Sequence, residues 1–158
     1  MKQYINTRLN KAKEMTRGKY NEFKGWTIPA NENPDDKGYL IFWSDNYTQW
    51  QPKEEFEKYN LKVDDNKKLP SGVSIGPNMI KDFIKSYEVI ECDGKTTIVH
   101  VTLINGYTLT EASSCVDPKN YSKDIGTKIC LEKIENRIWG LLGFLLQSAF
   151  MGVKYDNK

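Results

Sequence analysis

The pattern of apolar and polar positions is clearest in the second half of the chain. Apolar residues recur at helical spacing from Pro77 to Tyr87, and again in a long helix from about Ser122 to about Ala149. Between them, the β-branched run from Thr97 to Ile104 is followed by Asn105-Gly106 and by a return strand from Tyr107 to Ala112. This half is therefore predicted to form a helix, a β-hairpin and a long helix.

The turn of this hairpin decides which side chains face each other. With a two-residue turn, Ile104 faces Tyr107 and His100 faces Glu111. His100 is the single histidine of the chain, and a His–Glu pair can transfer protons. No Ser or Cys follows in an order that would complete a catalytic triad, so a structural pair is the favoured interpretation.

The first half has shorter elements with clear local signals. Thr16 can cap a short helix that Gly25 ends. Two β-prone runs, Tyr39–Trp43 and Tyr47–Trp50, flank turn formers at residues 44–46 and predict a second hairpin. Pro52 suits the first position of another short helix.

Together these elements predict an α+β protein of two small modules packed together. A chain of 158 residues is long enough for one ordinary domain or two very small ones. The aromatic-rich first module, helix–β-hairpin–helix, spans residues 1–61, and the polar, Gly- and Pro-bearing stretch 62–76 is the linker. The second module, helix–β-hairpin–long helix, spans 77–153, and residues 154–158 are a tail.

The long helix bears on the oligomeric state, because one small domain cannot cover it on every side. It would be roughly 40 Å long. Apolar residues surround much of its last part, namely Trp139, Phe144, Leu146, Phe150 and Met151. We therefore expect a homo-oligomer that forms through residues 125–150; the alternative is that both modules of one chain fold over the helix.

Composition and charge exclude several classes of protein. Basic and acidic residues are nearly balanced, 23 against 21, and are interspersed, so nucleic-acid binding is the least favoured activity. The apolar stretch Trp139–Val153 is shorter than a membrane span, and the first residues contain no apolar signal core. Three widely spaced cysteines suggest free thiols in a cytosolic protein without a membrane partner.

Candidate chemistry is sparse. One histidine and three dispersed cysteines provide no paired metal ligands. The sequence also contains no phosphate-binding loop and no Gly-x-Gly-x-x-Gly fingerprint. We therefore expect a binding protein with no catalytic residues, no metal and no cofactor.

The first candidate binding site is the concentration of aromatic residues in the first half. Their flat faces can stack on purine rings, and Arg17 or Lys24 is available to a phosphate. The alternative is that these large side chains fill a thin core. The candidate ligand-binding residues are Arg17, Tyr20, Trp26, Trp43, Tyr47 and Trp50.

The second candidate is the run of hydroxyls and carboxylates at residues 107–117. It lies between a strand end and a helix start, where phosphates bind well, although Glu111 and Asp117 would oppose an anion. Simple turn and capping roles are the alternative. The candidate residues here are Tyr107, Thr110, Glu111 and Ser113.

The second half also carries a family resemblance. Its motifs are the strand run Val99–Glu111, the loop Ser114–Tyr121, and the helix residues Ile125–Ile129 leading to Ile138–Phe144. From about Met79 to Ala149 the chain resembles the phage family named after gene product 49 of coliphage N-four and gene 66 of a Shigella phage. The resemblance implies an origin in a tailed phage or prophage, and hence the host cytoplasm, and it carries no catalytic residues to transfer.

The first half resembles a short element that is common in phage accessory proteins. Its motifs are Thr16-Arg17-Gly18-x-Tyr20-Asn21, Gly25-Trp26-x-Ile28-Pro29, Gly38-Tyr39-Leu40 and Tyr47-x-x-Trp50-x-Pro52-Lys53-x-x-Phe56-Glu57. Gly25-Trp26 and Trp50-x-Pro52 are similar to the Thoeris anti-defence two-like domain, whose members sequester nucleotide-derived immune signals. Gln51 stands where such sequences often place Ser, and it is the poorer helix cap.

The aromatic residues and this resemblance lead to one functional hypothesis. We expect a non-enzymatic phage accessory protein that sequesters a small nucleotide immune signal, such as a cyclic dinucleotide or an ADP-ribose derivative. The alternative is an inhibitor that docks on a host defence or replication protein through the apolar helix 138–153.

Overall fold

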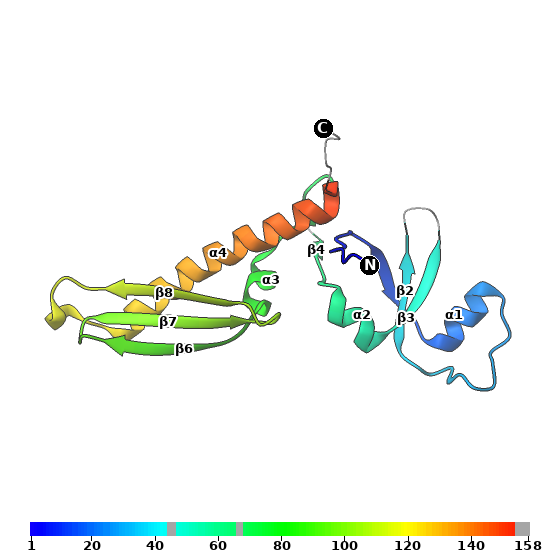
Figure 1. The fold of residues 1–158 in the computed structure, drawn as a ribbon, viewed down its shortest axis with the longest axis horizontal. Helices are drawn as coiled ribbons and strands as arrows, with labels where there is room; N and C mark the ends of the chain where they lie inside the picture. The colour runs from blue at the N-terminus through cyan, green and yellow to red at the C-terminus, as the bar shows by residue number, and fades with distance from the viewer. Residues whose placement is uncertain (44–46, 66–67, 154–158) are drawn as a thin grey trace. The chain divides into compact units, whose positions relative to one another are not determined.

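The computed structural model describes residues 1–43, 47–65 and 68–153 (Figure 1). The chain divides into two compact units, Met1–Lys62 and Val63–Lys158. Both contain helices and antiparallel strands, which confirms the predicted α+β class. The predicted turn at residues 44–46, part of the predicted linker at 66–67 and the predicted tail 154–158 lie outside the described residues.

The first unit is a three-stranded antiparallel sheet with two short helices. Its elements are β1 (Lys11–Glu14), α1 (Arg17–Lys24), β2 (Gly38–Phe42), β3 (Thr48–Pro52) and α2 (Lys53–Tyr59), and the strand order is β1-β2-β3. Pairing of β2 with β3 confirms the predicted hairpin. The sequence analysis missed β1, because all four of its residues are exposed and show no apolar alternation.

The helix α1 has the two ends that its sequence predicts. The Thr16 hydroxyl accepts from the backbone N–H of Lys19 at 3.4 Å. At the other end Gly25 adopts the left-handed conformation with φ of 69°, and the N–H of Trp26 donates to the carbonyl of Asn21. This closure fixes the path of the chain at Trp26.

The second unit contains a three-stranded antiparallel sheet in the order β6-β7-β8. These strands are β6 (Ile84–Cys92), β7 (Thr96–Leu103) and β8 (Thr108–Ser114), preceded by α3 (Pro77–Asp82) and followed by α4 (Lys123–Met151). Three small elements complete the unit, β4 (Asp64–Asp65), β5 (Val73–Ser74) and the 3-10 turn Pro118–Asn120. Thus β4 and β5 lie within the stretch 62–76 that was predicted to be a linker.

The strand β6 corrects the predicted helix over residues 77–87. The helix ends at Asp82, and the chain from Ile84 onwards pairs with β7. Met79 and Ile80 are buried as the helical spacing requires, whereas Ile84 and Val89 pack against the core from the strand. Phe83 at the end of the helix is buried with Met79 and Ile80, whereas the helical spacing of residues 84 and 87 was accidental and strand pairing overrides it.

The β7–β8 turn corrects the predicted register. Gly106, with φ of 82°, donates to the carbonyl of Leu103, and the N–H of Leu103 donates to Tyr107, so three residues form the loop. His100 therefore pairs with Thr110, and the predicted pairing with Glu111 is wrong by one position. Because a one-residue shift reverses the face, His100 and Glu111 lie on opposite faces of the sheet.

The long helix is confirmed and forms one wall of the second core. Ser122 caps α4, and every fourth residue of its first two thirds is buried, namely Gly126, Cys130, Ile134, Ile138 and Leu142. The helix packs on β7 and β8, whose inward side chains are Val99, Val101, Leu103 and Leu109. Within the described part of the chain, no helix combines the length and apolar character needed to cross a membrane.

Candidate functional site

Arg17 is anchored at the first turn of α1. Its Nε donates to Oε2 of Glu32 at 2.7 Å and its Nη2 donates to Oε1 at 2.5 Å, while the buried Asn21 amide donates to Oε2 at 3.0 Å. The hydrogen bonds from Arg17, and then the one from Asn21, lower the pKa of Glu32 to about 2. This bidentate pair holds the connection between α1 and β2 against the helix.

Trp50 has a structural environment on β3. Its indole Nε1 donates to the carbonyl of Met15 at 2.8 Å. Its ring lies so close to Gly38 that a Cβ atom there would collide with it. The Arg17 guanidinium carbon lies 5.2 Å from the ring centroid. Trp50 therefore contacts Met15, which follows β1, together with Gly38 of β2 and Arg17 of α1.

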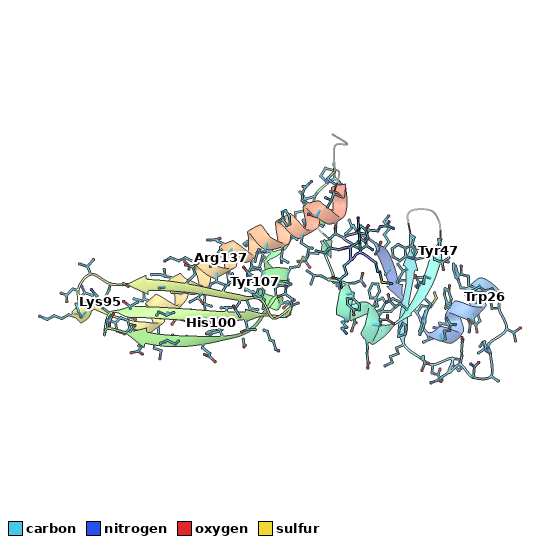
Figure 2. The ribbon with its side chains drawn as sticks, in the orientation of Figure 1. Trp26, Tyr47, Lys95, His100, Tyr107 and Arg137 are labelled. Carbon is cyan, nitrogen blue, oxygen red and sulfur yellow. The ribbon has the colours of Figure 1, made fainter. Side chains whose placement is uncertain are left out.

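Three other aromatic rings gather around one ammonium, and we call Tyr20, Lys24, Trp26 and Tyr47 the Lys24 aromatic group. The Lys24 Nζ atom lies 5.8, 5.9 and 6.0 Å from the centroids of Tyr20, Trp26 and Tyr47. Tyr20 and Trp26 meet edge to face at 5.9 Å. Burial of Tyr20 raises the pKa of its hydroxyl, whereas Trp26 is 56% and Tyr47 58% exposed (Figure 2 labels both). Solvent-accessible rings thus lie beside a cation.

Trp43 directly follows β2, four residues before Tyr47 of the Lys24 aromatic group. Its backbone N–H donates to the carbonyl of Tyr47 at 2.9 Å. The indole Nε1 is buried and has no hydrogen-bond partner among the residues that the structure describes. Trp43 is half-buried, so it is accessible only in part.

The second candidate segment does not converge into one site. Tyr107 is exposed at the hairpin turn, and Thr110 bonds to His100 Nδ1 at 2.8 Å on the sheet face away from α4. Glu111 lies on the other face and pairs with Arg137 Nη1 of α4 at 3.0 Å. From Tyr107 to Ser113 the strand advances about 20 Å. Figure 2 shows Tyr107, His100 and Arg137 around the sheet.

Ser113 belongs to a separate small pocket at the start of α4. This pocket has a volume of about 100 Å³ and is also lined by Lys95, Tyr121 and Ser122. The buried hydroxyl of Thr97 is satisfied there by the hydroxyl of Tyr121 at 3.1 Å. No group of three or more His, Cys, Asp and Glu side chains in the described ranges could hold a metal ion.

A larger pocket in the first unit, which we call the lysine pocket, was not predicted from the sequence. It has a volume of about 300 Å³ and is lined by Glu14, Met15, Thr16, Lys19, Lys37, Gly38 and Lys53. No sequence signal connects its lysines, because they come from three segments that only the fold brings together. The role of Glu32 as the partner of Arg17 was not predicted either, because Glu32 comes from a separate segment. The spacing of Arg17 and Asn21 does place these two residues on one face of α1.

Comparison with known proteins found a family match in the second unit. Residues 75–150 match the model of the Phage protein (N4 Gp49/phage Sf6 gene 66) family, which confirms the resemblance of that half. The match supports a phage accessory protein. No curated protein and no solved structure matches the chain. The similarity of the first half to the Thoeris anti-defence two-like domain stays a prediction.

Proposed function

We propose that this protein, whose second unit carries a domain of the phage Gp49/gene 66 family, sequesters a small nucleotide immune signal in its first unit without changing it chemically. The observation that carries the proposal is the Lys24 aromatic group, in which two exposed rings flank an ammonium. A nucleobase can stack on Trp26 or Tyr47 while Lys24 pairs with a phosphate oxygen.

The rigidity of Trp26 supports a binding role. Its backbone is fixed by the closure of α1, and its ring rests edge-on against the buried Tyr20. A ring that is already held in place loses little conformational entropy when a ligand binds, so more of the stacking energy appears as affinity. Stacking of one base on one aromatic side chain contributes about 1–3 kcal/mol.

The composition of the first unit supports sequestration over catalysis. Residues 1–62 contain no histidine and no cysteine. The ionic groups that contact the Tyr20 ring are Arg17 and Lys24, and a protonated lysine or arginine cannot act as a general base. We therefore expect a bound ligand to be released intact.

Isothermal titration against cyclic dinucleotides and ADP-ribose derivatives tests the proposal. Trp26→Ala should weaken binding about 5- to 150-fold, the ratio that corresponds to the stacking energy. Phe23→Ala is the matched control, since Phe23 is an exposed aromatic on α1, three residues before Trp26, and lies outside the group. Binding of none of these ligands would refute the proposal, and recovery of an altered ligand after denaturation would indicate an enzyme.

Self-association through α4 is the second part of the proposal. The residues from Trp139 to Met151 carry no charge, and six apolar side chains there are 39–76% exposed: Trp139, Leu141, Phe144, Leu145, Phe150 and Met151. An exposed apolar stretch of this kind is typical of a protein interface. Two copies can bury it against each other without separating any charged pair.

Phe144→Glu tests the association because Phe144 is 76% exposed, whereas Leu142 is buried and its replacement would disturb the core. Sedimentation equilibrium should give an oligomer for the unmodified chain and a monomer for the variant. A monomeric unmodified chain would contradict self-association. A host protein captured by that monomer, and lost with Phe144→Glu, would instead support the inhibitor that docks through this helix.

A further inference from the structure

The lysine pocket is built where three segments of the first unit meet. Lys19 comes from α1, Lys37 directly precedes β2, and Lys53 is the first residue of α2. Backbone hydrogen bonds hold these segments together, from Met15 N–H to the Gly38 carbonyl at 2.9 Å and from Lys53 N–H to the Lys37 carbonyl at 3.0 Å. Main-chain hydrogen bonds therefore hold together the backbone segments that carry the three lysines.

The pocket has an excess of positive charge. In the described part of the chain, neither the Lys19 nor the Lys37 ammonium forms an ion pair. Lys53 Nζ lies 3.9 Å from Glu14 and 3.6 Å from Glu57, and both carboxylates are more than half exposed. Of the lining side chains, three are cationic and one is anionic. A concave surface with such an excess concentrates anions.

The donors available to an anion are the ammonium groups. The first N–H groups of α1 are already used, since Arg17 N–H donates to the Asp36 carbonyl and Gly18 N–H to the Pro34 carbonyl. The guanidinium of Arg17 is held by Glu32. Lysine binds phosphate as a point charge, whereas a carboxylate is bound best by the planar fork of arginine, so the lining favours phosphate.

We propose that the lysine pocket binds the diphosphate or triphosphate group of a ligand. A volume of about 300 Å³ exceeds that of a single ion and lies at the lower end of small-molecule sites. The pocket lies at the N-terminal end of α1 and the Lys24 aromatic group at its C-terminal end, about 12 Å along the helix axis. The assignment to a nucleotide rests on the proposed function; the binding of phosphate groups does not.

Titration with inorganic pyrophosphate and with tripolyphosphate tests the pocket directly. Both should bind the full chain, and Lys37→Glu should weaken binding by about tenfold or more, which corresponds to about 1.4 kcal/mol. Lys11→Glu is the control, because it makes the same change of charge on β1 outside the pocket. Glu14→Gln should tighten binding about two- to fivefold, since it removes the carboxylate that lines the pocket.

Two results would overturn the inference. One is the absence of pyrophosphate binding to the folded chain, and the other is an equal loss of affinity with Lys11→Glu and Lys37→Glu. Lys37→Gln provides a milder variant, and circular dichroism confirms that each variant is folded. With Lys37→Gln the loss should be smaller than with Lys37→Glu, and an unchanged affinity in both would also count against the pocket.

The inference and the proposed function can fail separately. Binding of pyrophosphate without binding of any nucleotide would remove the proposed function and leave the pocket. Binding of a nucleotide that is insensitive to Lys37→Glu and is not displaced by pyrophosphate would remove the pocket and leave the proposed function. Displacement by pyrophosphate, together with loss on Trp26→Ala, is the result that we expect.

Discussion

The two units of this chain are stabilised by different kinds of contact. Among the residues that the structure describes, eleven of the fourteen buried apolar ones form one cluster in the second unit, and the other three are Tyr20, Leu40 and Ile41 of the first unit. The first unit is held instead by an ion pair, an amide and cation–aromatic contacts around Arg17. A thin core leaves aromatic and charged side chains at the surface, where a ligand can reach them, whereas the second unit is a conventional aliphatic scaffold.

The largest effect should follow from a cavity in the second core. Ile134 is fully buried on α4, so Ile134→Ala should destabilise the second unit by about 2–5 kcal/mol. Hydrogen exchange measured segment by segment should show the loss in β7, β8 and α4, with the first unit unchanged. Ile125→Ala, on the exposed side of the same helix, should cost no more than about 0.5 kcal/mol. Equal loss of protection from hydrogen exchange in both units would contradict the difference in core packing between them.

A smaller effect should distinguish two glycines of α4. A Cβ atom at Gly126 would collide with the hydroxyl of Thr97, so Gly126→Ala should destabilise the second unit by about 1–3 kcal/mol. Gly140 has open space around it, and Gly140→Ala should stabilise the helix by up to about 1 kcal/mol. Urea denaturation followed by helical circular dichroism measures both. The same sign for the two substitutions would contradict the close approach of α4 to β7.

The first unit should instead respond to pH through Glu32. Its pKa lies at about 2 in the folded chain against 4.5 for the ordinary group, so the ionised form stabilises the fold. That contribution is complete above the ordinary pKa and is lost as the pH falls from about 4.5 towards 2. Glu32→Gln should therefore lower the melting temperature at pH 7 by a few degrees and have almost no effect near pH 2.

Tryptophan fluorescence is the measurement, because Trp26, Trp43 and Trp50 report on the first unit and only Trp139 on the second. Asp35→Asn is the control for a change of charge, since Asp35 lies in the same connection and its backbone N–H donates to Asn33, whereas Arg17 is paired with Glu32. If the melting temperatures of Glu32→Gln and of the unmodified chain differed as much at pH 2 as at pH 7, the stabilising effect of the Arg17–Glu32 pair would not depend on the ionised carboxylate.

Local signals predicted the helices α1 and α4 and both hairpins. Thr16, Gly25 and Ser122 are caps that act within one helical turn. In α4 the buried residues recur every four positions over several turns, so the helix can be recognised from the sequence. The strands β1 and β6 were missed because they lie at sheet edges and are mostly exposed. The register of β8 depended on whether the turn had two residues or three, which Asn105-Gly106 alone does not decide.

The sequence predicted the candidate site only where the composition of the first half was a sufficient signal. Tyr20, Trp26 and Tyr47 do gather, as the aromatic content of the first half suggested. The indole ring of Trp50 instead contacts Arg17, Met15 and Gly38. The lysine pocket and the partner of Arg17 depend on contacts between residues 15 or more positions apart, which have no local signature.

The length of α4 has a consequence for binding strength. Its 29 residues extend about 43 Å, whereas the eight residues of β7 extend about 27 Å, so the helix is longer than the sheet it covers. If the proposed function and the proposed self-association both hold, two chains joined through its uncharged end would carry two nucleotide sites in one particle. The second site would then meet a ligand at high effective concentration, and a signal with two equivalent halves would be retained far longer than either site alone could hold it.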